Sequence, residues 1–385
     1  MRINLAFIAL LLFNALLLGF MITQISISSQ EAQGIFSTSD FSFVYARYFL
    51  DHFGFNDFAL RLPFLAIHFC NIWLIFELSK LYLKKPKDAL ICAWIYAFLP
   101  GVDITSILVG KSVFILFFAL LLCYVHIRRY YSLFFVLCTF GSLLDFSFSV
   151  IFLALFIYAF RFKHNKTLIF SLIGFSINMY FFKLPIGGSP SGHFLDTVGL
   201  LALLYSPFLF VYFIYTLYRG IIKKEKNLML YISATSIIFS LLLSLRQEID
   251  LFSFIPLSVV GLPIAIKDFL HNIRLRLPTF RRAYLRRFYT ILLPLVFEVL
   301  VLFGNKFLFL SEPKRHFLSN FYFAKELAET LKMHQISAIK TNPSLQSQLA
   351  FYGIKKADYP ILKQRKNGEI KIIYLGKVTK TYTIK

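Results

Sequence analysis

The residues of this chain that could do chemistry are a few carboxylates and cations set between long apolar segments. Glu31 and Asp40 follow the first apolar run, Asp103 follows a later one, and Lys183 and Arg246 follow others. A carboxylate can accept the proton of an attacking hydroxyl, and a Lys or Arg can neutralise a departing phosphate. Taken singly, each acid also fits an ordinary solvated loop residue. The elements that carry these groups must therefore decide whether they meet.

The composition predicts an all-α polytopic membrane protein. Of the 385 residues, 58% are hydrophobic and only 16% are charged, which does not describe a soluble surface. Crossing a bilayer takes roughly 17 to 25 apolar residues. We predict about eleven spans, several of them short, at 4–26, 61–80, 89–102, 112–127, 131–145, 146–160, 167–182, 198–218, 227–245, 251–266 and 288–310. The stretch 132–160 also fits one long tilted helix or a re-entrant hairpin. One span fewer would place the C-terminus on the opposite side of the membrane.

Positive charge sets the orientation, because Lys and Arg accumulate in cytoplasmic loops. Alternate loops are basic, and their cations are Arg2, Lys80, Lys84, Lys85, Lys87, Arg128, Arg129, Arg161, Lys163, Lys166, Arg219, Lys223, Lys224, Lys226, Lys267, Arg274, Arg276, Arg281, Arg282, Arg286 and Arg287. The opposite loops contain Arg47, Arg61, Lys111, Lys183 and Arg246 with the acids Glu31, Asp40, Asp51, Asp57, Asp103, Asp145, Asp196, Glu248 and Asp250. This pattern places the N-terminus in the cytoplasm and, with eleven spans, the C-terminus outside. The candidate residues then share the outer face.

Three segments are more than connectors between spans, namely the first outer loop, the outer loop 183–197 and the tail from Ser311. The first outer loop, 27–60, contains an amphipathic stretch at 41–53 that suits a helix in the membrane interface. The outer loop 183–197 is rich in turn-forming residues, and a plain flexible connector explains it as well as a functional loop. The first span is long for a signal peptide and lacks an A-x-A site, which favours a retained anchor.

The tail from Ser311 has the pattern of a small α/β domain. We expect a helix that is capped by Asn320 and runs through Met333, with Phe323, Leu327 and Leu331 on one face. A strand at 336–340 and a second helix from Pro343 to Gly353 should follow. Asn367-Gly368 predicts a type I′ hairpin between strands 361–365 and 370–375. Domain boundaries at 1–310 and 311–385 follow from this reading.

The sequence gives little support for nucleic-acid binding, for disulfide bonds or for a metal site. The basic stretch 274–287 could bind nucleic acid in isolation, but positive-inside anchoring with contact to anionic lipids explains it better, so no nucleic-acid partner is expected. The four Cys residues lie in apolar runs without disulfide or zinc spacing, and packing explains them. No ligand spacing supports a metal, although a divalent cation is compatible with an outer carboxylate site.

The segment 43–78 resembles the start of the second helix in lipid-linked-sugar glycosyltransferases of the GT-C fold, which include protein O-mannosyltransferases and lipid A aminoarabinose transferases. The most specific match is Phe53-Gly54 followed by Asn56-Asp57-Phe58-Ala59-Leu60-Arg61-Leu62-Pro63. Segments 88–100, 111–118 and 324–353 weakly resemble later segments of proteins in this family. The family usually has an acidic pair where this chain has Gln30-Glu31-Ala32, and an Asp where Lys111 stands.

The resemblance implies an inverting glycosyltransferase at the outer face of a bacterial cytoplasmic (inner) membrane. It would move a sugar from a polyprenyl-phosphate donor to a lipid or protein acceptor of the envelope. Glu31, the better positional match, or Asp40 would deprotonate the acceptor. Arg246 or Lys183 would stabilise the departing lipid phosphate, and Asp103 is a further substrate-binding candidate. The alternatives are a flippase or transporter of lipid-linked saccharide and a non-catalytic membrane partner protein.

Overall fold

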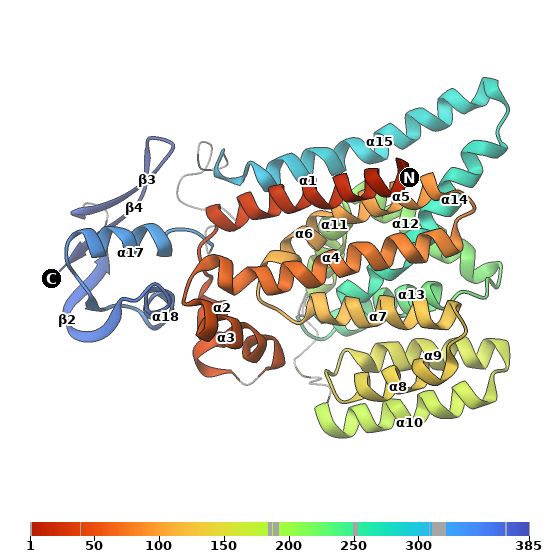
Figure 1. Ribbon diagram of the computed structural model, residues 1–385, viewed down its shortest axis with the longest axis horizontal. Coiled ribbons are helices and arrows are strands. Elements are labelled where there is room, and N and C mark those ends of the chain that lie inside the picture. The colour runs from red at the N-terminus through yellow and green to blue at the C-terminus, as the bar shows by residue number, and fades with distance from the viewer. Residues whose placement is uncertain are drawn as a thin grey trace. The chain divides into compact units, whose positions relative to one another are not determined.

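The computed structural model describes residues 2–38, 40–183, 187, 192–248, 253–307, 309, 321–365 and 368–384 (Figure 1). Its helices are α1 Arg2–Gln24, α2 Ser29–Ser37, α3 Phe41–Phe53, α4 Asp57–Tyr82, α5 Pro86–Ala97, α6 Pro100–Ile107, α7 Ser112–Ile127, α8 Tyr131–Ser142, α9 Phe148–Phe162, α10 Asn165–Phe182, α11 His193–Tyr205, α12 Pro207–Ile222, α13 Leu228–Ser244, α14 Leu262–Leu275, α15 Pro278–Phe303, α17 Ala324–Met333 and α18 Pro343–Phe351. The short 3₁₀ helices are η1 Ile255–Gly261 and η2 Asn305–Phe307, and the strands are β1 Ala338–Lys340, β2 Lys355–Gln364, β3 Ile370–Tyr374 and β4 Lys377–Ile384.

Apolar helices make this a helical membrane protein. Among the described residues, 3–24 in α1 and 57–82 in α4 are each long and apolar enough to cross a membrane. The pairs α5/α6 and α11/α12 also qualify when each is taken as one broken span, and α7, α8, α9 and α13 are shorter apolar helices. The count of eleven spans stays a prediction. In the 132–160 region the structure has two helices, α8 and α9, in place of one long one.

Two predicted spans are broken where a proline begins the second half. Helices α5 and α6 meet at 61° before Pro100, and α11 and α12 meet at 99° before Pro207. Proline has no N–H to donate to the preceding turn and disfavours helical geometry in the residue before it. Ser206, the residue before Pro207, has a φ of 74°. The predicted loop 183–197 is also shorter than expected, because α11 already begins at His193, while 184–186 and 188–191 lie outside the described residues.

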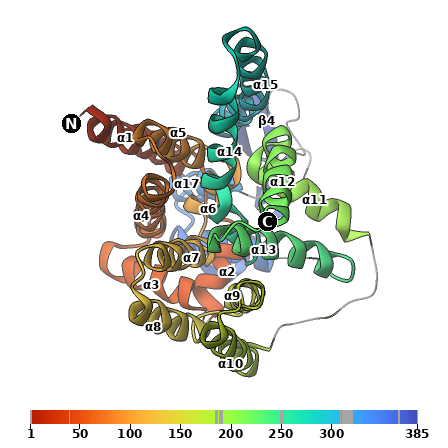
Figure 2. The same cartoon turned by 90° about the vertical axis from the view of Figure 1, so that its right-hand side faces the viewer.

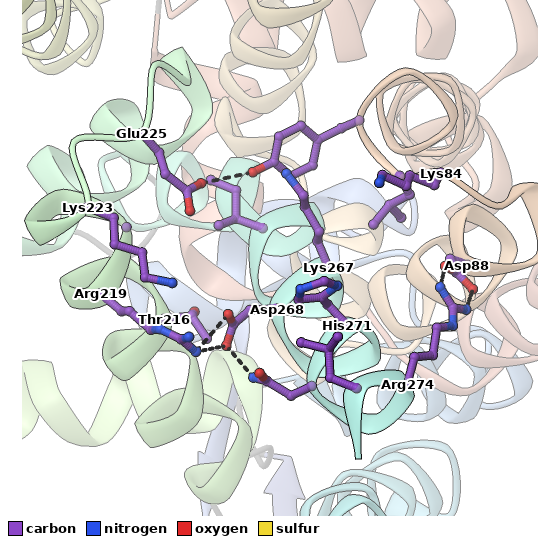
Figure 3. A pocket seen from close by; sticks show the side chains of 16 residues that line it. Lys84, Asp88, Thr216, Arg219, Lys223, Glu225, Lys267, Asp268, His271 and Arg274 are labelled. Carbon is purple, nitrogen blue, oxygen red and sulfur yellow. Dashed lines mark hydrogen bonds and ion pairs between the residues drawn. The ribbon is translucent and has the colours of Figure 1, made fainter. Parts of the chain in front are cut away.

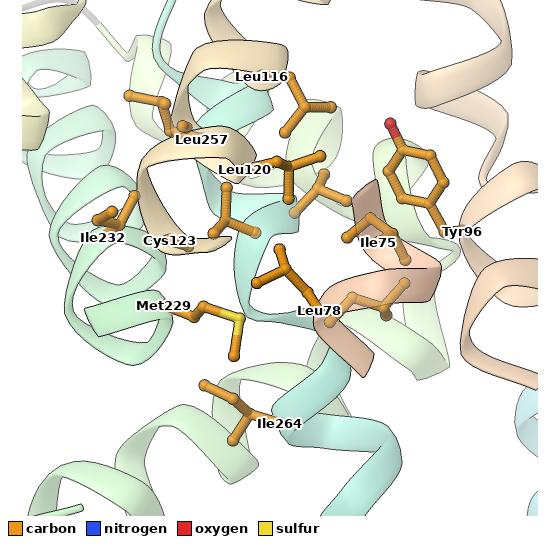
Figure 4. Packing of buried hydrophobic residues seen from close by; sticks show 14 of the residues in the cluster. Ile75, Leu78, Tyr96, Leu116, Leu120, Cys123, Met229, Ile232, Leu257 and Ile264 are labelled. Atoms are coloured by element: carbon orange, nitrogen blue, oxygen red, sulfur yellow. The ribbon is translucent and has the colours of Figure 1, made fainter. Parts of the chain in front are cut away.

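The chain divides into two compact units. Unit 1 comprises 1–14, 67–106 and 111–298, and its helices α7, α9, α10 and α13 run alongside one another in Figure 1 and are seen nearly end-on in Figure 2. Its core surrounds η1, which is buried along its whole length. A Cβ at Gly261 would lie 2.6 Å from Ser233 Oγ, so this contact between η1 and α13 needs glycine. Figure 4 shows the surrounding side chains, among them Ile75, Leu78, Leu116, Leu120, Met229, Leu257 and Ile264. Cys92, Cys123 and Cys138 are buried, Cys70 is exposed, and all four are free thiols.

Unit 2 comprises 15–66, 107–110 and 299–385, so the predicted first outer loop and the tail belong to one compact body. The amphipathic stretch of the first loop is the helix α3, with the predicted bounds 41–53. The tail helix α17 begins at Ala324, three residues later than predicted, with Phe323, Leu327 and Leu331 buried as expected. The second helix, α18, begins at Pro343 as predicted and ends at Phe351, and Gly353 follows at a φ of 87°.

The predicted pairing of strands in the tail is wrong. The sheet order is β1-β2-β4-β3, with β1 parallel to β2 and both other pairs antiparallel. Residues 361–364 of the predicted strand 361–365 lie in β2, which pairs with β4, whereas β3 forms its hairpin with β4 through Leu375-Gly376. Both turn residues have positive φ, at 49° and 78°, as a two-residue primed turn requires. Asn367 lies outside the described residues.

Candidate functional site

Arg61 organises the start of the first outer loop. Its side chain is fully buried and donates to the carbonyl oxygens of Ile25 and Ser26, each at 2.9 Å. Buried backbone groups need partners, and a planar guanidinium can serve two acceptors at once. Arg61 belongs to the Arg-Leu-Pro phrase that carries the family resemblance, and its role in this structure is to hold the chain as it leaves α1.

The Glu31 carboxylate fixes a second backbone segment. One oxygen accepts the Ser28 N–H at 2.9 Å, and the other accepts the Val109 N–H at 2.8 Å. Ser28 Oγ in turn accepts the Glu31 N–H, which completes a capping box at the start of α2. Arg61 Nη2 lies 4.0 Å from the carboxylate. Glu31 is only 4% exposed, so it is a buried anchor whose two oxygens are both engaged.

Asp57 ties the first loop to the tail. Its carboxylate accepts from Lys325 Nζ at 2.9 Å and from the Tyr352 hydroxyl at 2.8 Å. The same hydroxyl accepts the Ile27 N–H at 3.0 Å, while Gln348 donates to the Ile27 carbonyl at 2.7 Å. The hydroxyl of Tyr352 is buried and faces a carboxylate, which raises its pKa far above its usual range. Residues from α4, α17 and α18 thus hold one extended piece of backbone.

A polar pocket of about 490 Å³ opens in unit 2 beside this framework. Its volume lies within the range of about 300–1,000 Å³ that is typical of small-molecule sites. The polar side chains of the lining are hydroxyls, amides and two lysines, from Ser29, Tyr322, Thr341, Asn342, Ser344, Gln348, Lys363, Gln364, Lys380 and Tyr382. Hydroxyl and amide groups with a few cations are suited to a sugar or a sugar phosphate.

Lys380 is the most constrained cation of the polar pocket. Burial lowers the pKa of its ammonium group, and Nζ lies 4.0 Å from the centre of the Phe323 ring. Burial also raises the pKa of Tyr382 to about 12, so this neighbour stays a neutral hydroxyl. Lys363, in contrast, is exposed at the rim. The pocket therefore offers one partly enclosed and one solvated positive charge.

An apolar groove of about 480 Å³ lies between α3 and the start of α4 in the same unit. Its lining is mainly aromatic and aliphatic, and consists of Tyr45, Phe49, Phe53, Asn56, Phe58, Ala59, Leu62, Pro63 and Ala66. Phe53, Phe58 and Leu62 are exposed to solvent. Exposed apolar surface of this extent in one place is typical of a lipid or ligand contact.

The remaining candidate residues are placed differently. Asp40 is exposed just before α3, and its side chain makes no capping hydrogen bond. Lys183 and Arg246 are exposed after α10 and α13. Asp103 is fully buried within α6, in unit 1. Glu31 and Asp40 therefore share unit 2, whereas the other three candidates belong to unit 1.

Lys111, which stands where the glycosyltransferases that the sequence resembles have an Asp, is part of a partly buried ion pair in unit 1. Its Nζ lies 2.9 Å from the Asp145 carboxylate and 3.9 Å from the centre of the Phe146 ring. Asp145 also accepts from the N–H of Ser147 at 2.9 Å. The lysine is thus paired, and it lies directly before the start of α7.

Sequence reasoning did not single out the residues that build the polar pocket. Lys363, Lys380, Gln348 and Tyr382 are scattered over the tail without a motif, and only the fold brings them to one place. Asp57 and Arg61 belong to the phrase that resembles the glycosyltransferases, but the sequence predicted no structural role for either residue. In the described ranges of the chain, no group of three or more His, Cys, Asp or Glu side chains could hold a metal ion.

The comparisons with known proteins add no further information on family. No protein-family model matches the chain, and neither a curated protein nor a solved structure matches it.

Proposed function

We propose that this protein is a membrane glycosyltransferase. It would take a sugar from a polyprenyl-phosphate donor and transfer it to a lipid or protein acceptor on the outer face of a bacterial cytoplasmic membrane. The observation that carries the proposal is that unit 2 contains both the polar pocket and the apolar groove. A lipid-linked sugar has a polar end and an isoprenoid end, and needs a site of each kind.

The apolar groove suits the polyprenyl chain. It lies on α3, whose amphipathic pattern is typical of a helix at the membrane interface. An isoprenoid tail is flexible and apolar, so exposed aromatic side chains such as Phe53 and Phe58 would lose contact with water when it binds. The gain comes from buried apolar area and needs no hydrogen bonds.

The polar pocket suits the sugar and its phosphate. Lys380 and Lys363 supply positive charge, while Ser29, Asn342 and Gln348 offer groups that can both orient and distinguish hydroxyls. Lys183 and Arg246, which belong to unit 1, stay candidates from the sequence for stabilising the departing lipid phosphate.

Asp40 is the better candidate for the general base. A base needs a free carboxylate oxygen within reach of the acceptor hydroxyl. Asp40 is exposed, whereas both oxygens of Glu31 already accept backbone N–H groups. We assign Glu31 the role of an anchor that holds α2 and the 107–110 segment, and Asp40 the role of proton acceptor.

The test is transfer by the purified protein in lipid nanodiscs. The donors are undecaprenyl phosphates that carry a radiolabelled hexose or pentose, and the readout is label in an envelope acceptor extract or, without acceptor, free sugar from hydrolysis. Transfer or hydrolysis that is lost in Asp40→Asn supports the proposal. No turnover of any donor contradicts it, and movement of intact donor across vesicles without turnover identifies a flippase.

A further inference from the structure

A second pocket, in unit 1, lies where several helices end. It has a volume of about 400 Å³ and is formed by the end of α4, the start of α5, the end of α12 and the length of α14. All of these ends carry the Lys and Arg residues that the loop-charge rule assigns to the cytoplasmic side. We refer to it as the basic pocket. The proposed sugar transfer at the outer face does not use it.

The charged residues of the basic pocket fall into two groups. Two arginines are already paired with aspartates, one on each side of the pocket in Figure 3. Arg219 Nη1 lies 2.9 Å from Asp268, and Arg274 forms a two-point ion pair with Asp88. These pairs join α12 to α14 and α14 to α5, so they fix the walls.

Three lysines complete the lining without a carboxylate partner. Within the described part of the chain, Lys84, Lys223 and Lys267 form no ion pair, and all three are exposed. Lys267 Nζ lies 3.8 Å from the centre of the Tyr82 ring, which holds its ammonium group at the wall. Glu225 accepts from the Tyr82 hydroxyl at 3.2 Å. The pocket therefore combines fixed walls with a surplus of positive charge.

We propose that the basic pocket binds a phosphate group, in the form of the headgroup of an anionic phospholipid. Lysine ammonium groups are compact point charges that bind phosphate oxygens from several directions. Basic pockets between transmembrane helices at the cytoplasmic side are suited to phosphorylated headgroups. Lys84 and Lys223 lie just after the ends of α4 and α12, Lys267 lies on α14, and His271 and Asn272 add polar groups on α14.

The experiment measures binding of short-chain phosphatidic acid, short-chain phosphatidylcholine and inorganic phosphate to the purified protein in neutral detergent. The variant Lys84→Gln/Lys223→Gln/Lys267→Gln removes the unpaired lysines. Its matched control, Lys85→Gln/Lys87→Gln/Lys166→Gln, removes the same charge from the same predicted side at exposed residues that do not line the pocket.

We expect phosphatidic acid to bind the unaltered protein and the control variant equally within a factor of three, and the pocket variant at least ten-fold more weakly. If inorganic phosphate binds as tightly as phosphatidic acid and the pocket variant weakens both equally, the pocket is a phosphate site whose ligand is a soluble anion and not a lipid headgroup. Equal losses in both variants would attribute binding to the general charge of this face and overturn the proposal. So would an absence of phosphatidic acid binding, or equal binding of phosphatidylcholine.

Discussion

The hydroxyl of Tyr352 donates to the carboxylate of Asp57 at 2.8 Å and accepts the N–H of Ile27 at 3.0 Å. One side chain near the end of α18 thus contacts the beginning of α4 and the segment that leaves α1. These contacts join the first outer loop and the tail within unit 2. The polar pocket depends on this connection, because Ser29 comes from the loop and the rest of its lining comes from the tail.

Removing the Tyr352 hydroxyl should loosen this connection. In Tyr352→Phe, the Ile27 N–H loses its acceptor and Asp57 loses a donor, and an unsatisfied buried group costs about 1–3 kcal/mol. We expect hydrogen exchange at the Ile27 amide to become at least ten-fold faster. The control is Tyr359→Phe, because Tyr359 is 75% exposed. Unchanged exchange at Ile27 would show that this hydroxyl does not hold the segment.

Replacing Arg61 of α4 should destabilise the segment that leaves α1. Arg61→Met leaves two carbonyl oxygens and the neighbouring Glu31 charge without their buried partner. Breaking a buried charge pair by removing one partner costs about 3–5 kcal/mol. We expect a lower midpoint of thermal unfolding and less protein in the membrane, whereas Arg282→Met, at an exposed position, should leave both unchanged. Equal behaviour of the two variants would refute the structural role of Arg61.

Glu31 and Asp40 should respond to neutralisation in opposite ways. In Glu31→Gln, an NH₂ group replaces one of the two oxygens that accept backbone N–H groups, so one buried donor loses its acceptor. The substitution should therefore lower the free energy of unfolding by about 1–3 kcal/mol. Asp40→Asn should preserve stability and slow transfer by roughly 10²- to 10⁴-fold, the usual contribution of a general base. Thermal unfolding and transfer rates are measured on the same preparations. A stable Glu31→Gln protein without activity, beside an active Asp40→Asn, would reverse the two roles.

The β3–β4 turn offers a test that is independent of function. Leu375 has a φ of 49°, a conformation that costs most residues about 1–2 kcal/mol but that Asn adopts more readily. Leu375→Asn should slow hydrogen exchange of the β3 and β4 amides, and Gly376→Ala, at a φ of 78°, should accelerate it. The opposite order would contradict the turn at Leu375-Gly376.

The sequence predicted well those features that depend on local pattern. Helix α3 and the buried face of α17 follow from the spacing of apolar residues, and α18 begins where a proline starts a helix. The predicted hairpin at Asn367-Gly368 is wrong because Asn-Gly is a strong local signal for a two-residue turn. Leu375-Gly376 is a weak turn signal, and this turn forms because the flanking strands β3 and β4 pair. The breaks at Pro100 and Pro207 interrupt apolar runs that hydropathy alone reads as continuous.

The candidate site could be predicted only in part, because it depends on contacts between residues that are far apart in the sequence. Charge patterning placed Glu31 and Asp40 in one loop, but which carboxylate is free depends on the N–H group of Val109, which is 78 residues away from Glu31. The polar pocket likewise arises from residues that are close only after the tail has folded against the first loop.

The most direct test of the central claim is the affinity of the purified protein for a polyprenyl-phosphate sugar. Lys363→Gln/Lys380→Gln removes the two pocket lysines, and Lys355→Gln/Lys371→Gln removes two exposed lysines from the same sheet that do not line the pocket. We predict that the first pair weakens donor binding at least ten-fold and that the second changes it less than three-fold. Equal affinity of both variants and the unaltered protein, or no binding of the donor by the unaltered protein, would contradict the account.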